Sequence, residues 1–340
     1  MARLRSPGTG VIGPACCIPV PSATLSAGRR WTGRRCGRHT LSSHDPRAIE
    51  SHRRGAAHPW QRRFTQFASH DPGGKLFQAA AIQLNSTGDR DANWEQAATL
   101  IREASALGAR FVCTPENTPF LGPHEEKVNR AESLNGPTCG RFSALARELE
   151  IHLLLGSFAE LSDEPARCFN TSVLFGPDGH RIAAYRKIHL FDVDVSDELR
   201  FQESATVKPG DAVVVAQTDI GRIGLSVCFD LRFAELFGAL RGQGAEIITI
   251  PSAFTATTGR DHWHVLVRAR AIETQSFVVA AAQQGRHDDG GLRESFGHSL
   301  IVDPWGEILA EARGGPGIAL AQIDFERLLK VRRAIPMEGS

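Results

Sequence analysis

The sequence predicts an α/β domain in which two packed β-sheets are flanked by helices. From residue 76 onward, short apolar runs typical of buried strands alternate with stretches whose apolar residues recur at helical spacing. The expected strands number about a dozen, too many for one twisted open sheet. With 340 residues, 41% of them hydrophobic, the chain is long enough to bury such a core.

The first half of this region is expected to supply strands and two helices. Phe77–Gln83 is a short apolar run suited to a buried strand. Residues 91–107 show helical periodicity with Gly108 as a C-cap, and Arg141–Glu150 is expected as a second helix. Further strands are expected at Phe111–Thr114, His152–Phe158, Ser172–Phe175 and Ile182–Tyr185. The turn signal Pro177-Asp178-Gly179 joins the last two as a hairpin.

The second half repeats the alternation and ends in a run of strands. Helical periodicity predicts helices at Arg232–Arg241 and His262–Thr274. Strands are expected near Val213–Gln217, Gly224–Val227, Glu246–Ile250, Phe277–Ala282, Ser299–Val302, Ile308–Ala312 and Ile318–Ile323. Because no repeat at a solenoid period is visible, residues 76–340 are expected to form one domain.

The first 75 residues have a different composition. Residues 1–65 hold twelve arginines, no lysine, and only Asp45 and Glu50 as acids, for a charge of +10. Because they lack a sustained apolar period, residues 1–75 are expected to be disordered. They fit either an organellar transit peptide or a leader added by a start codon placed too far upstream. A nucleic-acid-binding arm is less well supported, since no aromatic residues are interleaved with the arginines.

Composition also excludes several classes of function. The rest of the chain carries a charge of −9, which argues against a nucleic-acid partner. The longest apolar runs are short, so no membrane-spanning helix is expected. Seven cysteines without a CxxC pair indicate reduced thiols rather than disulfides or structural zinc. A cytoplasmic location is expected, or a mitochondrial one if the leader is a transit peptide.

Cys228 is the cysteine with the best local setting for a nucleophile. It ends the apolar run Ile223–Val227, and Asp230 follows as the expected N-cap of a helix. A thiol beside a helix N-terminus lies in a positive field that favours the thiolate. The backbone N–H of Phe229 would point outward at such a turn and could donate to an oxyanion. Taken alone, this context is more often that of a buried structural cysteine.

Two charged residues also follow predicted strands. Glu116 comes after Phe111–Thr114, where a carboxylate can face a cleft and act as a general base. Lys187 comes after Ile182–Tyr185, where a fixed ammonium can hold a developing oxyanion. Each is more often a solvated side chain when taken alone, so the functional interpretation depends on their coincidence with Cys228.

Three segments together resemble the signature segments of the nitrilase, or carbon–nitrogen hydrolase, superfamily. They are Pro115–Asn117, Tyr185–Phe191 and Gly224–Phe233, which contain the glutamate, the lysine and the cysteine in the family's order. The resemblance extends from about residue 77 to the end of the chain. It implies a four-layer αββα sandwich, commonly assembled as a homodimer or higher homo-oligomer, that uses no metal or organic cofactor.

The resemblance also implies roles for the matching residues. Glu116 would be the general base, Lys187 the stabiliser of the transition state and Cys228 the nucleophile. The thiolate would attack an amide carbonyl, and the resulting thioester would be hydrolysed by water. Glu203 is similar to the family's second glutamate, which supports the lysine.

Further segments resemble the branch of the superfamily that contains deaminated-glutathione amidase and ω-amidase. They are residues 251–254, 262–273 and 297–306. This branch acts on amides of 2-oxoglutarate, so the expected reaction converts deaminated glutathione to 2-oxoglutarate and cysteinylglycine. ω-Amidase or N-carbamoyl-amino-acid hydrolase activity, which would release ammonia, is the alternative. A catalytically inactive scaffold protein is the alternative from another functional class.

Residues near the nucleophile are expected to bind the substrate. Arg232 could clamp a substrate carboxylate, although an arginine in a helix cap or core ion pair would look the same in sequence. Ser252 and Phe254 lie at a strand end on the same rim and are expected to shape the pocket. No metal site is predicted at His262 and His264, because no further Asp, Glu or His lies at a fitting spacing.

Overall fold

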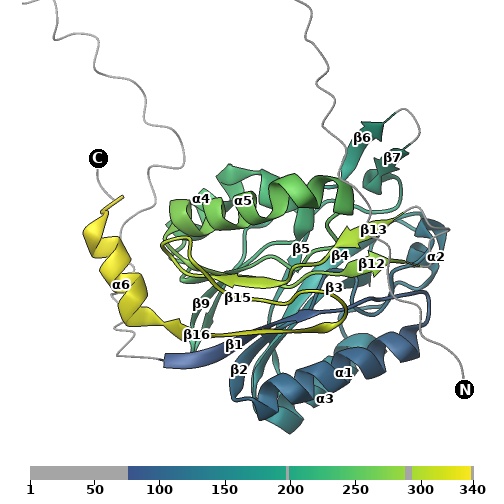
Figure 1. Ribbon diagram of the computed structural model, residues 1–340. Coiled ribbons are helices and arrows are strands. Elements are labelled where there is room, and N and C mark those ends of the chain that lie inside the picture. Colours follow the sequence, from purple (N-terminus) through teal and green to yellow (C-terminus); the bar gives the residue numbers. More distant parts are fainter. Residues whose placement is uncertain (1–75, 197–198, 288–292, 338–340) are drawn as a thin grey trace, which may run out of the picture. The chain divides into compact units, whose positions relative to one another are not determined.

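Two six-stranded β-sheets pack face to face in the computed structural model, and helices cover the outer face of each sheet (Figure 1). The structure describes residues 76–196, 199–287 and 293–337. The predicted leader, residues 1–75, lies outside the described residues. The four layers form an αββα sandwich, as the sequence and its family resemblance predicted.

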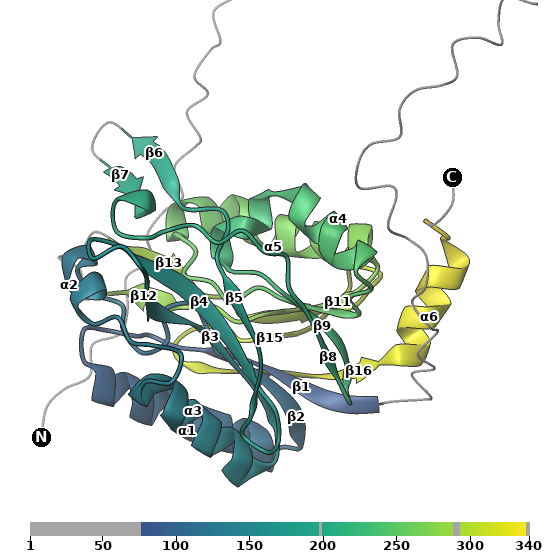
Figure 2. The ribbon, with the colours of Figure 1, turned by 180° about the vertical axis from the view of Figure 1, so that it is seen from behind.

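The first sheet has the strand order β16-β1-β2-β3-β4-β5. Its strands are β1 (Leu76–Gln83), β2 (Ala109–Cys113), β3 (His152–Leu161), β4 (Cys168–Phe175), β5 (Arg181–Arg186) and β16 (Gly317–Asp324). β1, β2 and β3 are parallel, whereas β4, β5 and β16 pair antiparallel with their neighbours. Helices α1 (Arg90–Ala106) and α3 (Pro137–Leu149) lie on the outer face, as Figure 2 shows from behind.

Both faces of the first sheet are buried, and β1 shows why its middle, residues 79–82, is a continuous apolar run. Ala79 and Ala81 belong to the hydrophobic cluster between the two sheets. Ala80 and Ile82 belong to the cluster formed with α1 and α3. Because successive side chains of a strand point to opposite faces, a strand covered on both sides needs apolar residues at every position.

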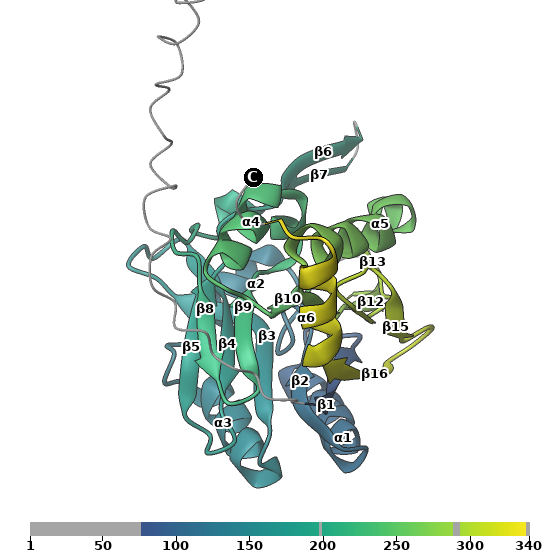
Figure 3. The same ribbon diagram turned by 90° about the vertical axis from the view of Figure 1, so that its left-hand side faces the viewer.

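The second sheet has the strand order β15-β14-β11-β10-β9-β8. Its strands are β8 (Val215–Thr218), β9 (Gly221–Leu225), β10 (Ile247–Thr249), β11 (Phe277–Ala280), β14 (Leu300–Val302) and β15 (Ile308–Glu311). β9, β10 and β11 run parallel. Helices α4 (Ala234–Gly242) and α5 (Ala256–Thr274) cover this sheet, and the side view in Figure 3 shows the layers edge-on.

Several short elements were not predicted from the sequence. They are α2 (His124–Asn129), the hairpin β6 (Asp192–Ser196) and β7 (Leu199–Gln202), the pair β12 (Gln284–Arg286) and β13 (Glu294–Phe296), and α6 (Phe325–Ala334). The predicted helix Arg232–Arg241 begins later than expected, at Ala234, because Cys228–Arg232 form a 3₁₀ turn. Among the described helices, none combines the length and the apolar character that a membrane crossing requires.

Candidate active site

The ends of three strands bring the predicted catalytic residues to one edge of the sandwich. Glu116 follows β2, Lys187 follows β5 and Cys228 follows β9. β2 is parallel to β3 and β9 is parallel to β10, so within each sheet the carboxyl ends of these strands share an edge. These edges of the two sheets lie next to each other. Ala253, in the loop after β10, donates its N–H to Glu116 Oε2 at 2.8 Å.

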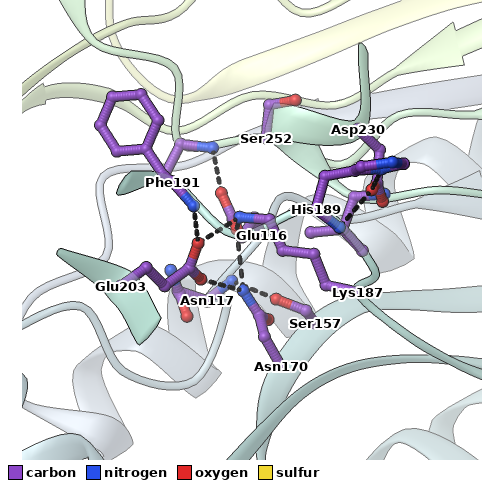
Figure 4. A network of polar contacts seen from close by, with 12 residues as sticks. Glu116, Asn117, Ser157, Asn170, Lys187, His189, Phe191, Glu203, Asp230 and Ser252 are labelled. Carbon is purple, nitrogen blue, oxygen red and sulfur yellow. Dashed lines mark hydrogen bonds and ion pairs between the residues drawn. The ribbon is translucent and has the colours of Figure 1, made fainter. Parts of the chain in front are cut away.

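The Lys187 ammonium lies between two buried carboxylates. Its Nζ is 3.0 Å from Glu116 Oε1 and 2.9 Å from Glu203 Oε2, and 1% of the residue is exposed (Figure 4). Burial by itself would lower the pKa of Lys187, but the two carboxylates and Cys228 outweigh burial and raise the pKa well above its ordinary value. Lys187 is therefore a permanent cation held in the site.

Glu203, the second glutamate expected from the resemblance, holds Lys187 from the other side. Its Oε2 also accepts the backbone N–H of Phe191 at 2.8 Å. Burial raises the pKa of Glu203, but two nearby lysines and these hydrogen bonds lower it below its ordinary value. The carboxylate therefore stays ionised and fixes the position of the ammonium.

Asn170 is a member of the site that the sequence did not reveal. Its Nδ2 donates to Glu116 Oε1 at 2.9 Å and to Glu203 Oε1 at 3.1 Å, so it ties the two carboxylates together (Figure 4). It lies in β4, whose other residues are largely apolar, and it is completely buried. A lone asparagine in an apolar strand was the available signal, because a buried amide needs polar partners.

Cys228 occupies a strained backbone position next to Glu116. Its φ of +49° lies in the left-handed region, which is uncommon for a residue other than glycine and is often found at functional sites. The residue is 7% exposed, and the Glu116 carboxylate is near enough to raise the pKa of its thiol. The N–H of Phe229 belongs to the first turn of the following 3₁₀ segment, where amides have no partner within the helix.

The prediction that the thiolate of Cys228 is favoured is wrong for this state of the protein. Burial raises the pKa of the thiol, and the Glu116 carboxylate adds to the rise, so that together they outweigh Lys187. Only a five-residue 3₁₀ segment begins at Cys228, which is a weak source of positive field. The thiol of Cys228 therefore keeps its proton.

Asp230 joins the strand that carries Lys187 to the turn that carries Cys228. The sequence predicted it as a helix N-cap, but α4 begins four residues later. Its carboxylate instead accepts hydrogen bonds from the Tyr185 hydroxyl at 2.7 Å, the Val227 N–H at 2.9 Å and the His189 N–H at 3.0 Å. Because Asp230 is completely buried, these bonds offset the cost of placing its charge there.

Replacing Tyr185 by phenylalanine should lower the free energy of unfolding by about 1.5–3 kcal/mol, the usual range for a hydrogen bond to a charged group. Burial and Asp230 raise the pKa of the Tyr185 phenol far above its ordinary value, so the hydroxyl always donates. Urea unfolding followed by circular dichroism measures the change. Ser143→Ala is the control, since that hydroxyl donates to the neutral carbonyl of Gly179. Equal losses in the two variants would contradict a charged acceptor.

Arg232 ends the 3₁₀ segment that begins at Cys228. Its Cζ is 5.0 Å from the centroid of the Phe254 ring and 5.9 Å from that of Phe229. Its Nη1 is 3.3 Å from His262 Nδ1. In the described part of the chain no carboxylate forms an ion pair with Arg232. The alternative of a core ion pair is therefore not found among these residues. The guanidinium is half-buried and available to an anion.

The other predicted substrate-binding residues differ in burial and contacts. Phe254 is 4% exposed and packs on Trp263 with ring centroids 5.3 Å apart, so its ring supports Arg232. Phe229 is partly exposed and contacts Phe191 edge-on at 5.2 Å. Ser252 is completely buried and donates its hydroxyl to the Ile250 carbonyl, so a role in shaping the pocket stays a prediction.

Comparison with known proteins identifies relatives over most of the chain. Residues 78–333 match the family model described as carbon–nitrogen hydrolase. The chain is 42% identical to a deaminated glutathione amidase of Synechocystis over 265 residues, which cover 77% of this chain and 97% of that protein. It is 39% identical to human ω-amidase, covering 77% and 93%. The crystal structure of Saccharomyces cerevisiae Nit3 superposes with a TM-score of 0.71 at 32% identity, covering 78% and 96%.

Proposed function

The chain belongs to the carbon–nitrogen hydrolase family and is a hydrolase of carbon–nitrogen bonds other than peptide bonds, and we propose that it hydrolyses deaminated glutathione. The observation that supports this proposal is a buried carboxylate, ammonium and thiol in one cluster, beside an arginine without a carboxylate partner among the described residues. The relatives named deaminated glutathione amidase, at 42–43% identity, support the same substrate.

Acylation would begin with the proton of the Cys228 thiol, whose pKa is raised by burial and by Glu116. Glu116 takes this proton while the sulfur attacks the amide carbonyl carbon, forming a carbon–sulfur bond. Lys187 and the Phe229 N–H hold the resulting oxyanion. When the tetrahedral intermediate collapses, the carbon–nitrogen bond breaks and Glu116 gives its proton to the leaving amine. The amine is cysteinylglycine, and the 2-oxoglutaryl group remains on Cys228 as a thioester.

Deacylation would use the same groups in reverse order. Glu116, again ionised, takes a proton from a water molecule that attacks the thioester carbonyl. The carbon–sulfur bond then breaks, the sulfur recovers the proton from Glu116, and 2-oxoglutarate leaves. Throughout both steps Glu203 and Asn170 would hold Lys187 and Glu116 in place, so that no side chain needs to reorganise.

Arg232 would select a substrate that carries a carboxylate. The 2-oxoglutaryl group ends in a carboxylate that a planar guanidinium can bind through two hydrogen bonds. The rings of Phe229 and Phe254 would limit the movement of the guanidinium, which lowers the entropy lost on binding. A neutral amide would not benefit from this contact, so the site should discriminate by charge.

The experiment is a panel of amides tested on wild type and Arg232→Gln. Wild type should release 2-oxoglutarate from deaminated glutathione. In Arg232→Gln, kcat/KM for that substrate should fall by about 30- to 100-fold, mainly through KM, which corresponds to about 2–3 kcal/mol for a charged hydrogen bond. Hydrolysis of butyramide, a neutral amide, should change less than about threefold in the same variant, since a substrate without a carboxylate loses no such bond.

The panel distinguishes the alternatives. Failure of wild type to release 2-oxoglutarate from deaminated glutathione would reject this substrate, while ammonia release from 2-oxoglutaramate would indicate ω-amidase activity. Ammonia release from N-carbamoyl amino acids would indicate the corresponding hydrolase. Equal losses on charged and neutral amides in Arg232→Gln would reject the carboxylate clamp without rejecting amide hydrolysis.

A further inference from the structure

Two histidines and a glutamate converge beside the second sheet, where α5 meets the β14–β15 edge. His264 lies on α5, His298 precedes β14, and Glu311 ends β15. One possible ligand atom from each side chain lies within 4.8 Å of the other two. The sequence showed no such cluster at a fitting spacing from His264, because both partners lie more than thirty residues away along the chain.

The geometry suits a cation of the zinc type. His264 Nε2 and His298 Nδ1 are 3.0 Å and 2.6 Å from the same atom, Glu311 Oε1. A tetrahedral Zn²⁺ at about 2.0–2.2 Å from each ligand atom would separate these atoms by about 3.3 Å. His264 Nε2 and His298 Nδ1 therefore each need to move away from Glu311 Oε1 by less than about 1 Å to admit the ion. Two imidazoles and one carboxylate also favour Zn²⁺ over Mg²⁺ or Ca²⁺, which prefer oxygen ligands.

The surroundings hold the ligands in place. The His298 ring stacks on Phe296 with centroids 4.3 Å apart, and the His264 ring meets Phe296 edge-on at 5.9 Å. Trp263 Nε1 donates to the His298 carbonyl at 2.8 Å, which fixes the backbone beside the ligand. Such contacts orient metal ligands before the ion binds.

Charge and exposure are also compatible with an ion. Arg313 occupies only Oε2 of the glutamate and leaves Oε1 to face the histidines. The two histidine side chains are 32% and 31% exposed, so an ion and its water ligands can enter.

We propose that His264, His298 and Glu311 form a binding site for a zinc-type divalent cation, with water completing its coordination. The ion would join α5 to the edge formed by β14 and β15. It would act as a clamp between a helix and a sheet edge, outside the amide-hydrolysing centre.

Equilibrium dialysis of the full chain against Zn²⁺ tests this site, with zinc counted per chain. All proteins carry Cys228→Ala, which removes the thiol of the active site as a competing ligand. His264→Gln should bind one equivalent less than the parent. His180→Gln is the matched control, since His180 is an exposed histidine on the turn before β5, and its zinc content should equal that of the parent.

A second variant tests the site in the opposite direction. Arg313→Gln removes a positive charge beside the ion and should tighten zinc binding by about threefold or more. This variant keeps the test decisive if His264→Gln is poorly folded. Equal zinc contents in His264→Gln and His180→Gln, or unchanged affinity in Arg313→Gln, would overturn the proposal. Binding of Mg²⁺ equal to that of Zn²⁺ would overturn the assignment of the cation class.

Discussion

Replacing Cys228 by alanine should lower kcat/KM for amide hydrolysis by at least about 10⁴-fold, as removal of a nucleophile does in other enzymes with a covalent intermediate. Glu116 and Lys187 remain in the variant, but without sulfur there is no atom to form the thioester. Initial rates with deaminated glutathione measure the loss. Mass spectrometry of the quenched reaction gives an independent readout, since wild type should carry a 2-oxoglutaryl adduct and the variant should not.

The control for this prediction is Cys139→Ala. Cys139 lies in α3, is 3% exposed, and has a pKa raised to about 11, chiefly by burial. It is therefore a protonated thiol remote from the strand ends that form the site. Its replacement should leave kcat/KM within about twofold, because a buried inert cysteine acts only through packing. Hydrolysis at the wild-type rate by Cys228→Ala would reject the covalent mechanism.

The fold could be predicted because the apolar composition of its core strands indicates that they are buried. Phe77–Gln83 is apolar at nearly every position, since helices cover one face of its sheet and the second sheet covers the other. The short hairpin β6–β7 could not be predicted in the same way. Its sequence, with Asp192 and Asp194 alternating with valines, lacks the flanking turn chemistry that marks a hairpin.

The members of the site differed in how far the sequence revealed them. Glu116, Lys187 and Cys228 follow strands directly, so their positions at strand ends could be predicted from local patterns. Asn170 and Asp230 act through partners that are 33 and 45 residues away along the chain, which no local pattern encodes. Their roles depend on which strands become neighbours.

The protonation of Cys228 illustrates a competition between effects that only the structure resolves. A helix N-terminus favours the thiolate by an amount that falls off within the first turn. Burial and an adjacent carboxylate act in the opposite direction and prevail here. Sequence identifies the turn that follows the cysteine, but it does not show how deeply the thiol is buried or which charge lies beside it.

Replacing Lys187 by methionine should cost about 3–5 kcal/mol in the free energy of unfolding at neutral pH, the range for a buried ion pair that loses one partner. Glu116 and Glu203 would remain buried, at 3% and 7% exposure, without the cation between them. Activity should fall as well, because the oxyanion would lose its charged partner, typically by about 10²–10³-fold. Lys208→Met is the control, since Lys208 pairs with Asp163 and Glu164 at the surface and its loss should barely move the unfolding midpoint.

The cost of Lys187→Met should depend on pH in a defined direction. The raised pKa of Lys187 means that its stabilisation is fully present below the ordinary pKa of lysine and is lost as pH rises through the folded value. The lowered pKa of Glu203 means that its stabilisation is present above the ordinary pKa of glutamate and is lost as pH falls through the folded value. Between these limits the wild-type ion pair is intact.

Without the ammonium, the buried carboxylates of the variant would be stabilised by taking up protons, which is easier at low pH. Urea unfolding should therefore show a smaller difference in the free energy of unfolding between wild type and variant at pH about 5 than at pH about 8. A difference that grows as the pH is lowered would mean that the lysine does not neutralise these carboxylates.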